Sequence, residues 1–278
     1  LDDIIQHFGT KDLLKVLKSI KIADISCGSG SFLFCVSKLL KVLYTKCGVS
    51  KDQSFSLIYN HNLYGLDIDR EAIEIVKFRI VMDYLISNVR IDLNFENFKV
   101  CDSLLLDDDH TLEKSFDIVL GNPPYIENRN LNNKTLYKDY NTYNCKNIYA
   151  YFLERNMSLL KDSGMMGMIV PISYTATKRM KPIRESLLKH SKYHFCASFA
   201  DRPSSLFVGV HQKINIILLE KGKPGKKHNY TTSYYHWNST EKKTLFKDIS
   251  YVENKFDSQD FMLKVGSKIE SSIIGKLL

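Results

Sequence analysis

The residues best suited to chemistry lie in the stretch FDIVLGNPPYIENRN, residues 116–130, where an apolar run ends at Gly121. Asn122 offers a side-chain carbonyl, and the main-chain carbonyl of Pro123 precedes a second proline, Pro124, which has no N–H donor. Both oxygens can accept hydrogen bonds from one NH2 group. A planar exocyclic amine becomes nucleophilic when its hydrogens are held in this way, and the prolines fix the acceptors beforehand. The stretch therefore predicts an amine-activating corner.

Tyr125 follows the prolines directly. Its ring offers a flat face on which a planar base or amide can stack, worth about 1–3 kcal/mol for a nucleobase. A strand that simply ends at two prolines is the alternative interpretation. The residues upstream must decide between the two.

A glycine loop lies upstream, in ADISCGSGSF, where Gly28 and Gly30 follow a β-branched run. Glycine lets the backbone approach a ligand closely and adopt positive φ. The loop lacks both the GxGxxG spacing of dinucleotide sites and the GKS or GKT ending of phosphate loops. A nucleoside triphosphate is not favoured, and dinucleotide binding or a plain strand-to-helix turn are the alternatives.

Acidic residues follow the next two predicted strands. Asp67, in LYGLDIDREAI, holds the position from which a carboxylate accepts both hydroxyls of a ribose. Ile68 is expected to lie on one face of an adenine, and Asp102 to accept from the adenine amino group. Asp24 is expected to bind loop amides or the amino-acid part of a cofactor, and Asp69 to cap a helix.

The apolar periodicity predicts an α/β fold with a seven-stranded, mostly parallel sheet and helices on both faces. Ligands of such sheets bind at the carboxyl ends of the strands. Strands are expected at 21–26, 62–68, 98–101, 116–120, 165–170, 193–198 and 213–219, and helices at 12–20, 32–43, 71–85, 148–160 and 181–188.

The 278 residues, 44% hydrophobic and 25% charged, are typical of a soluble globular protein. No apolar run reaches the ~18–20 residues of a membrane span, and the first residues lack a signal peptide, so we expect no membrane association and a cytoplasmic protein. The six cysteines show no metal-ligand spacing, and we expect no metal site. Lys and Arg exceed Asp and Glu by 39 to 31, which favours a polyanionic partner.

A linker rich in Gly, Pro and Lys, KGKPGKKHN, follows residue 220. We therefore predict a catalytic domain at 1–221 and, at 222–278, a linker and the start of a truncated C-terminal region. Residue 1 is Leu rather than Met, which indicates a piece of a longer protein.

The glycine loop, Asp67 and Asp102, in this order, resemble the class I S-adenosylmethionine-dependent methyltransferases. S-adenosylmethionine carries no phosphate, which suits a loop without the phosphate-loop lysine. The resemblance implies S-adenosylmethionine as cofactor. The expected cofactor contacts are Asp24, Cys27, Gly28, Gly30, Asp67, Ile68, Asp102 and Asn122.

NPPY occurs in adenine DNA methyltransferases, in some RNA methyltransferases and in release-factor glutamine methyltransferases. Residues 147–190 contain a Y-x-x-F helix, a strand ending in IVP and a basic helix with IRESLL, and FADRPSSLFVGVHQKINIILLEK follows at 199–221. This order is similar to the amino-methylating DNA methyltransferases of the gamma motif order, and most similar to the methylase part of type II restriction-modification enzymes, including fused ones. The resemblance implies that Phe207 packs on the second face of a flipped adenine.

The resemblance also implies double-stranded DNA as partner, a fused or separate nuclease and a C-terminal recognition domain. The target base must leave the stack, which costs a few kcal/mol. Phosphate contacts are expected from a basic cluster, which is otherwise a solvated surface. The cluster comprises Lys178, Arg179, Lys181 and Arg184. Tyrosines in the segment 128–147 either contact DNA or pin that segment to the core.

Two features depart from the family pattern. The N-terminal Thr-Pro segment is absent, unless Gly9-Thr10-Lys11 is a degenerate remnant of it, so the source of its cofactor contacts is open. Ile25 and Ser26 replace the usual Pro and Ala of the glycine motif. The predicted function is methylation of adenine N6 in DNA within a restriction-modification system. A protein glutamine or RNA base methyltransferase is the alternative, and an inactive fragment that binds cofactor and DNA is the second.

Overall fold

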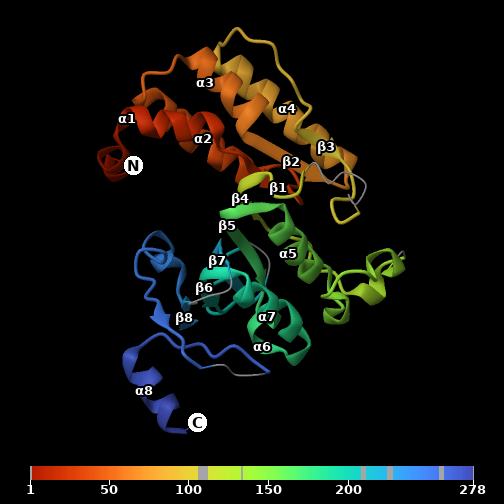
Figure 1. Ribbon diagram of the computed structural model, residues 1–278, viewed down its shortest axis with the longest axis vertical. Helices are drawn as coiled ribbons and strands as arrows, with labels where there is room; N and C mark the ends of the chain where they lie inside the picture. Colours follow the sequence, from red (N-terminus) through yellow and green to blue (C-terminus); the bar gives the residue numbers. More distant parts are fainter. Residues whose placement is uncertain are drawn as a thin grey trace. The chain divides into compact units, whose positions relative to one another are not determined.

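The computed structural model describes residues 2–105, 112–132, 134–207, 211–223, 228–256 and 260–277. The chain divides into two compact units, Leu1–Gly121 and Asn122–Leu278, hereafter unit 1 and unit 2 (Figure 1).

Unit 1 alternates strands and helices, as its sequence predicts. Its described helices are α1 (Asp2–Ser19), α2 (Ser31–Lys46), α3 (Lys51–Leu57) with a π-helical turn (Ile58–Asn62), and α4 (Arg70–Ser87). Its described strands are β1 (Ile22–Asp24), β2 (Leu63–Asp67), β3 (Phe98–Val100) and β4 (Phe116–Gly121). The strands pair in parallel in the order β3, β2, β1, β4. Because all four strands run in the same direction, their C-terminal ends lie at the same edge of the sheet.

Local signals set the ends of the helices in unit 1. The Ser50 hydroxyl accepts the Gln53 N–H at the start of α3, and Asp69 accepts the Glu71 N–H at the start of α4. Asn88 ends α4 in the left-handed conformation, with φ of 48°. Gly9, with φ of 70°, kinks α1. The cap predicted at Asp69 is thereby confirmed.

Aromatic side chains fill the core of unit 1. The buried Tyr44 hydroxyl donates to the Leu17 carbonyl at 2.6 Å and to Asn62 Oδ1 at 2.9 Å, which ties α2 to α1 and the π-helical turn. On β2, Tyr64 meets Phe116 of β4 edge to face, with ring centroids 5.1 Å apart, and Lys21 lies over the Tyr64 ring. These contacts hold the strands that carry the site.

Unit 2 contains a mixed sheet. Its described strands are β5 (Leu160–Pro171), β6 (Ser191–Phe199), β7 (Ile214–Lys221), β8 (His228–Tyr235) and β9 (Val252–Glu253). Its described helices are α5 (Ile148–Leu159), α6 (Ser173–Ala176), α7 (Lys181–Lys189) and α8 (Lys268–Leu277), with short 3-10 turns at 128–130, 134–137, 143–145, 178–180 and 239–243. The strand order is β5, β7, β6, β8, β9, in which β7 runs antiparallel to both neighbours and β6 pairs with β8 in parallel.

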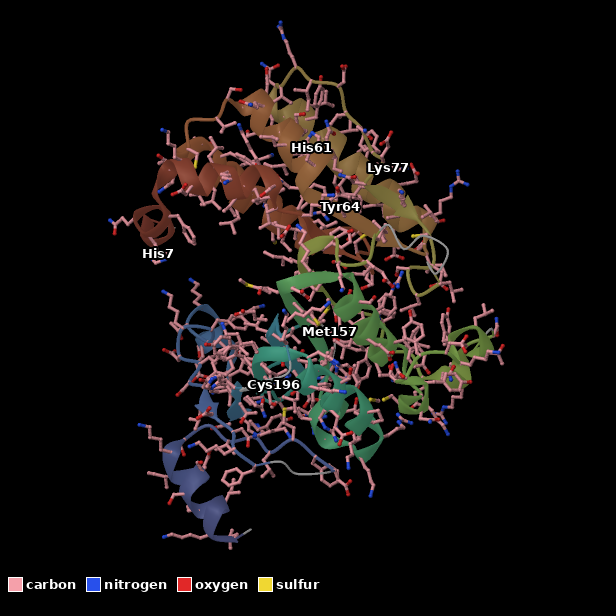
Figure 2. The ribbon with its side chains drawn as sticks, in the orientation of Figure 1. His7, His61, Tyr64, Lys77, Met157 and Cys196 are labelled. Carbon is pink, nitrogen blue, oxygen red and sulfur yellow. The ribbon has the colours of Figure 1, made fainter. Side chains whose placement is uncertain are left out.

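One face of this sheet is buried. Met166, Met168 and Val170 alternate with more exposed residues along β5, and Met157 of α5 and Cys196 of β6 also lie in the interior (Figure 2). The fully buried His194 joins β6 to its neighbours, since its Nδ1 lies 3.0 Å from Asn229 Oδ1 and its Nε2 3.1 Å from the Tyr174 hydroxyl. Burial lowers its pKa to about 4, so the imidazole is neutral.

All seven predicted strands are present, and the described residues form two further strands, β8 and β9. The strands β8 and β9 lie beyond residue 222, where the sequence shows no strong period, and β8 joins the sheet of unit 2. The helix expected at 12–20 begins instead at Asp2, and α3 has no counterpart among the predicted helices. The described helices include none with the length and hydropathy of a membrane span. No cluster of three possible metal ligands occurs among the described residues.

The packing around Gly65 of β2 generates a prediction. A Cβ atom there would lie 2.9 Å from Leu33 Cδ1 and 3.0 Å from Phe98 Cδ1. Overpacking of this kind costs about 1–3 kcal/mol, so Gly65→Ala should lower the free energy of unfolding by that amount in chemical denaturation. Gly167→Ala on β5 is the control, because its Cβ would meet only Leu218 Cδ2, at 3.4 Å. Equal stability of the two variants would contradict the packing argument.

Candidate active site

The glycine loop connects β1 to α2 through two residues with left-handed backbones. Gly28 has φ of 50° and Gly30 φ of 79°, and Gly30 precedes the first turn of α2. A Cβ on Gly30 would lie 3.0 Å from Val76 Cγ2. Conformation and space both require glycine at residue 30, while Gly28 is required by conformation alone. Both predicted glycines therefore form the floor of the loop.

Asp67 lies at the glycine loop, although 39 residues separate it from Gly28. Its Oδ2 accepts the Gly28 N–H at 2.8 Å, and its Oδ1 accepts the Asp69 N–H at 2.9 Å. The Cys27 N–H donates to the Leu66 carbonyl at 3.0 Å, which continues the link between loop and β2. Each carboxylate oxygen keeps a further lone pair, so Asp67 can still accept from a ligand.

The neighbours of Asp67 differ in accessibility. Ile68 is 68% exposed and offers an apolar face next to the carboxylate. Cys27, in contrast, has a buried side chain in the core of unit 1, so it can face a ligand only through its main chain. Asp102 accepts the Leu104 N–H at 3.0 Å, and the Ser103 hydroxyl donates to the Ile25 carbonyl at 2.7 Å, which holds the Asp102 turn against the loop.

Asp24 ends β1 and is 1% exposed. Burial is the main cause that raises its pKa to about 7, helped by the charge of Asp67 and opposed by a hydrogen bond from the Ser26 N–H. A Cβ on Gly121 would lie 2.8 Å from Asp24 Oδ1. Gly121 is thus a site residue that the sequence did not reveal: it ends β4 without a side chain because the carboxyl group fills that space.

Arg79 of α4 is a second residue that sequence reasoning missed. Its guanidinium donates to the Ser29 carbonyl at 2.6 Å and lies over the Phe34 ring, 4.1 Å from the centroid. It therefore holds the glycine loop from the side of α4. Helical periodicity alone would assign it to a solvated face.

The corner after β4 is compact. Asn122 is partly buried and Pro123 buried, and the Tyr125 hydroxyl donates to Asn122 Oδ1 and, at 3.2 Å, to the Ile169 carbonyl of β5. The Tyr125 ring meets Tyr149 of α5 edge to face at 6.4 Å. Burial raises the pKa of Tyr125, which keeps the hydroxyl protonated. Asn122 and Tyr125, three residues apart, are thus joined across Pro123 and Pro124.

The segment 128–147 is fixed to α5. The rings of Tyr137, Tyr140 and Tyr143 contact that of Tyr151, at centroid distances of 5.8, 5.6 and 6.3 Å. Glu154 accepts four hydrogen bonds of 2.7–3.0 Å from Asn141 and Thr142. Of the two interpretations of these tyrosines, the structure supports the one in which they pin the segment to the core.

The predicted basic cluster needs one correction. Arg184 is 4% exposed, and its guanidinium donates to the carbonyls of Tyr174, Thr177 and Asp260 at 2.6–2.9 Å. The prediction that it contacts the DNA backbone is wrong, because the side chain is enclosed and satisfied within unit 2. Hydrophobic periodicity assigns every arginine of an amphipathic helix to the polar face, so the sequence does not distinguish a buried arginine such as Arg184 from an exposed one.

The rest of that cluster reaches the surface. Lys178 pairs with Asp260 at 3.1 Å, Arg179 with Glu127 at 3.3 Å, and Lys181 with Glu185 at 3.7 Å. Such exposed pairs contribute about 0–1 kcal/mol, so their cations can exchange partners.

Phe207, the predicted second stacking residue, packs against a cluster of unit 2 that contains Phe199, Ile214 and Trp237. It is only partly buried, so part of its ring stays accessible. Its role at a base remains a prediction.

The raised pKa of Asp24 generates a test. Between 3.8 and about 7 the folded state binds more protons than the unfolded state, so this contribution to stability is present at low pH and lost as the pH rises through 7. One pKa unit corresponds to about 1.4 kcal/mol, so the full contribution is at most about 4 kcal/mol. Asp24→Asn should remove a decrease of about 2.6 kcal/mol in unfolding free energy between pH 5 and 8, measured by denaturant titration. The same substitution at the exposed Asp92 should leave that decrease intact, and identical pH profiles for wild type and Asp24→Asn would exclude this role.

A family model described as Eco57I restriction-modification methylase matches residues 61–207, more than half of the chain. RM.Eco57I of Escherichia coli, a type II restriction enzyme and methyltransferase, is 24% identical over 237 residues, which cover 68% of this chain and 23% of that protein. The adenine-specific methyltransferase BrxX of Escherichia coli O9:H4 strain HS is 37% identical over 65 residues, 23% of this chain and 5% of its own.

Solved structures agree on the fold. A nuclease-deletion mutant of the Type ISP restriction-modification enzyme LlaGI, in complex with a DNA substrate mimic, matches with a TM-score of 0.69 at 19% identity, over 93% of this chain and 25% of that one. The fold is that of the class I S-adenosylmethionine-dependent methyltransferases. Fold and family together imply S-adenosylmethionine as the cofactor. The chain belongs to the Eco57I restriction-modification methylase family.

Proposed function

We propose that the protein containing this chain is a site-specific DNA methyltransferase that methylates N6 of an adenine, as part of a restriction-modification system. The observation that carries the proposal is the corner at residues 122–125, where an asparagine carbonyl and a tyrosine ring are fixed together directly after β4. Membership of the methylase family supports it. The adenine-specific name of BrxX supports the choice of base.

The corner acts on the amine by hydrogen bonding and stacking. Asn122 Oδ1 and the Pro123 carbonyl accept the two hydrogens of the exocyclic nitrogen, which localises its lone pair for attack on a methyl group. Tyr125 stacks on one face of the base and Phe207 on the other. Because the acceptors are preorganised, polarisation and proximity supply most of the rate enhancement. The methyl–sulfur bond would break as the N–C bond forms, with its electron pair staying on sulfur, and the proton would then pass from the nitrogen to solvent.

The edge of unit 1 suits the cofactor. Asp67 is proposed to accept the ribose hydroxyls, Ile68 to lie on the adenine, and Asp102 to accept from its amino group. The loop at Gly28 and Gly30 gives the backbone close access to the ligand, and Asp24 attracts the ammonium of the methionine part. When bound, S-adenosylmethionine supplies a methyl group that its sulfonium makes electrophilic.

We propose that the whole protein contains a complete recognition region in addition to the catalytic residues of this chain. Residues 1–221 are assigned to catalysis and 222–278 to the beginning of a recognition region, while a nuclease is fused or separate. Duplex DNA hides the adenine amino group, so the base is flipped out of the helix, at a cost of a few kcal/mol.

Loss of the amide carbonyl tests the proposed chemistry. Asn122→Ala in the full-length protein should lower transfer of labelled methyl groups to DNA by about 10²–10³-fold, because one preorganised polar partner is removed. Asn130→Ala, an exposed asparagine of the same segment, is the matched control and should retain activity. Mass spectrometry of the digested DNA should identify N6-methyladenine.

Parallel reactions on RNA and on a release factor separate the alternatives. Label in either, with none in DNA, would favour the RNA base or glutamine methyltransferase. Cofactor binding by calorimetry without turnover on any DNA would favour the inactive binding fragment. Unchanged labelling of DNA by Asn122→Ala would exclude the mechanism.

The basic surface generates a second prediction. Replacing Lys178, Arg179 and Lys181 together by Ala should weaken DNA binding and reduce the slope of log K against log salt by about 2–3, since each phosphate contact contributes about 0.9. Changing Lys11, Lys15 and Lys18 of α1 together, which are exposed and also basic, should leave the slope unchanged. Fluorescence anisotropy across a salt series measures both, and equal slopes would assign Lys178, Arg179 and Lys181 to a solvated surface.

A further inference from the structure

The Tyr125 hydroxyl lies between two oxygens that only accept hydrogen bonds. One is Oδ1 of Asn122, and the other is the Ile169 carbonyl, at 3.2 Å. The single hydrogen of the hydroxyl is therefore shared between the two acceptors, and the contact with Asn122 is the shorter one. Base stacking needs only the ring of Tyr125, so the proposed function leaves this polar contact without a role.

Packing around the Tyr125 ring restrains the position of its hydroxyl next to Asn122 and Ile169. Tyr149 meets the ring edge to face, with centroids 6.4 Å apart and planes at 81°. Tyr149 is itself fully buried, and its hydroxyl lies 2.8 Å from Ser173 Oγ at the start of α6. The Tyr125 oxygen is thus held in place by α5 and by the β5 carbonyl.

An asparagine amide accepts a substrate hydrogen reliably only when a neighbouring donor fixes which of its two ends carries the oxygen. Its terminal torsion is broad, and its oxygen and NH2 ends have nearly the same shape, so rotation would replace an acceptor by a donor. A fixed O–H donor beside one end favours the orientation with oxygen there. The amide oxygen has two lone pairs, so one accepts the tyrosine and the other stays free for a substrate amine.

We propose that the Tyr125 hydroxyl is a positioning group that holds the Asn122 amide with its oxygen in the accepting place, separately from the stacking role of the ring. This inference rests on the proposed function, since it concerns the same corner. The proposal assigns positioning of the amide to the Tyr125 hydroxyl and base stacking to its ring. The two roles can be separated, because a variant without the hydroxyl keeps the ring.

Tyr125→Phe in the full-length protein tests the proposal on a duplex containing the site that the wild type methylates. The single-turnover rate of methyl transfer should fall about three- to tenfold, the effect of one neutral hydrogen bond. Affinity for the duplex, and the fluorescence of 2-aminopurine at the target position, should change less than twofold, because the stacking ring remains. A wild-type rate for this variant would overturn the proposal.

Tyr44→Phe provides a matched control for the loss of a buried hydroxyl. The Tyr44 hydroxyl also donates to an asparagine Oδ1 and a main-chain carbonyl, in the core of unit 1. Both variants should lower the melting temperature, but only Tyr125→Phe should slow methyl transfer. Equal slowing in both would show that the effect follows stability and would overturn the proposal.

Asn122→Asp separates positioning from simple support of the loop. A carboxylate presents an acceptor at both ends, so no orientation remains to be selected. Adding Tyr125→Phe to Asn122→Asp should therefore change the rate less than twofold, and a further three- to tenfold loss would contradict the proposal. Should Asn122→Asp be inactive, the comparison of Tyr125→Phe with Tyr44→Phe decides. Failure of the proposed function is recognised separately, as absence of methylation by the wild type.

Discussion

Parallel pairing of β1 with both β2 and β4 is the constraint on which the candidate site depends. The register aligns Asp24 with Gly65 and Ile22 with Ile118, while β2 aligns Asp67 with Val100 of β3. Because parallel strands end at the same edge, residues distant in sequence reach one place without any direct attraction between them. The Asp67 carboxylate then fixes the glycine loop through the Gly28 N–H. Asn122, the first residue of unit 2, follows Gly121 directly in the chain.

This edge places negative groups close together, at a cost. Asp24 is buried near Asp67, and its raised pKa records the unfavourable free energy of ionising it there. The missing side chain of Gly121 gives the carboxyl group its space. A ligand with a positive charge would offset this cost, since attraction to a cation favours the ionised form. Carboxyl groups whose pKa is raised by burial and by a neighbouring charge are common at binding sites.

The sequence predicted the features that depend on local patterns, such as strands, glycine turns and helix caps. The strands at 63–67 and 116–121, the two loop glycines and the cap at Asp69 follow from apolar patterning, conformational requirement and capping chemistry. It could not predict residues whose role depends on distant partners. Arg184 has the sequence signature of a surface residue yet satisfies three carbonyls inside unit 2, and Arg79 supports a loop 50 residues away. The pinning of segment 128–147 needs Glu154, whose four hydrogen bonds no periodicity encodes.

The edge of unit 1 and the corner of unit 2 carry different polar groups, and their proposed ligands differ in the same way. The edge of unit 1 offers carboxyl groups, which suit the hydroxyls and ammonium of an adenosine-linked amino acid. The corner offers uncharged carbonyls, which suit an uncharged amine. A carbonyl dipole stabilises positive charge that develops on the nitrogen as it attacks, but it is too weakly basic to take a proton beforehand. In the proposed reaction the nitrogen therefore keeps both hydrogens, and with them its orientation, until the new bond has formed. A fixed hydroxyl beside the amide serves the same end, because only the oxygen end of Asn122 provides such a dipole.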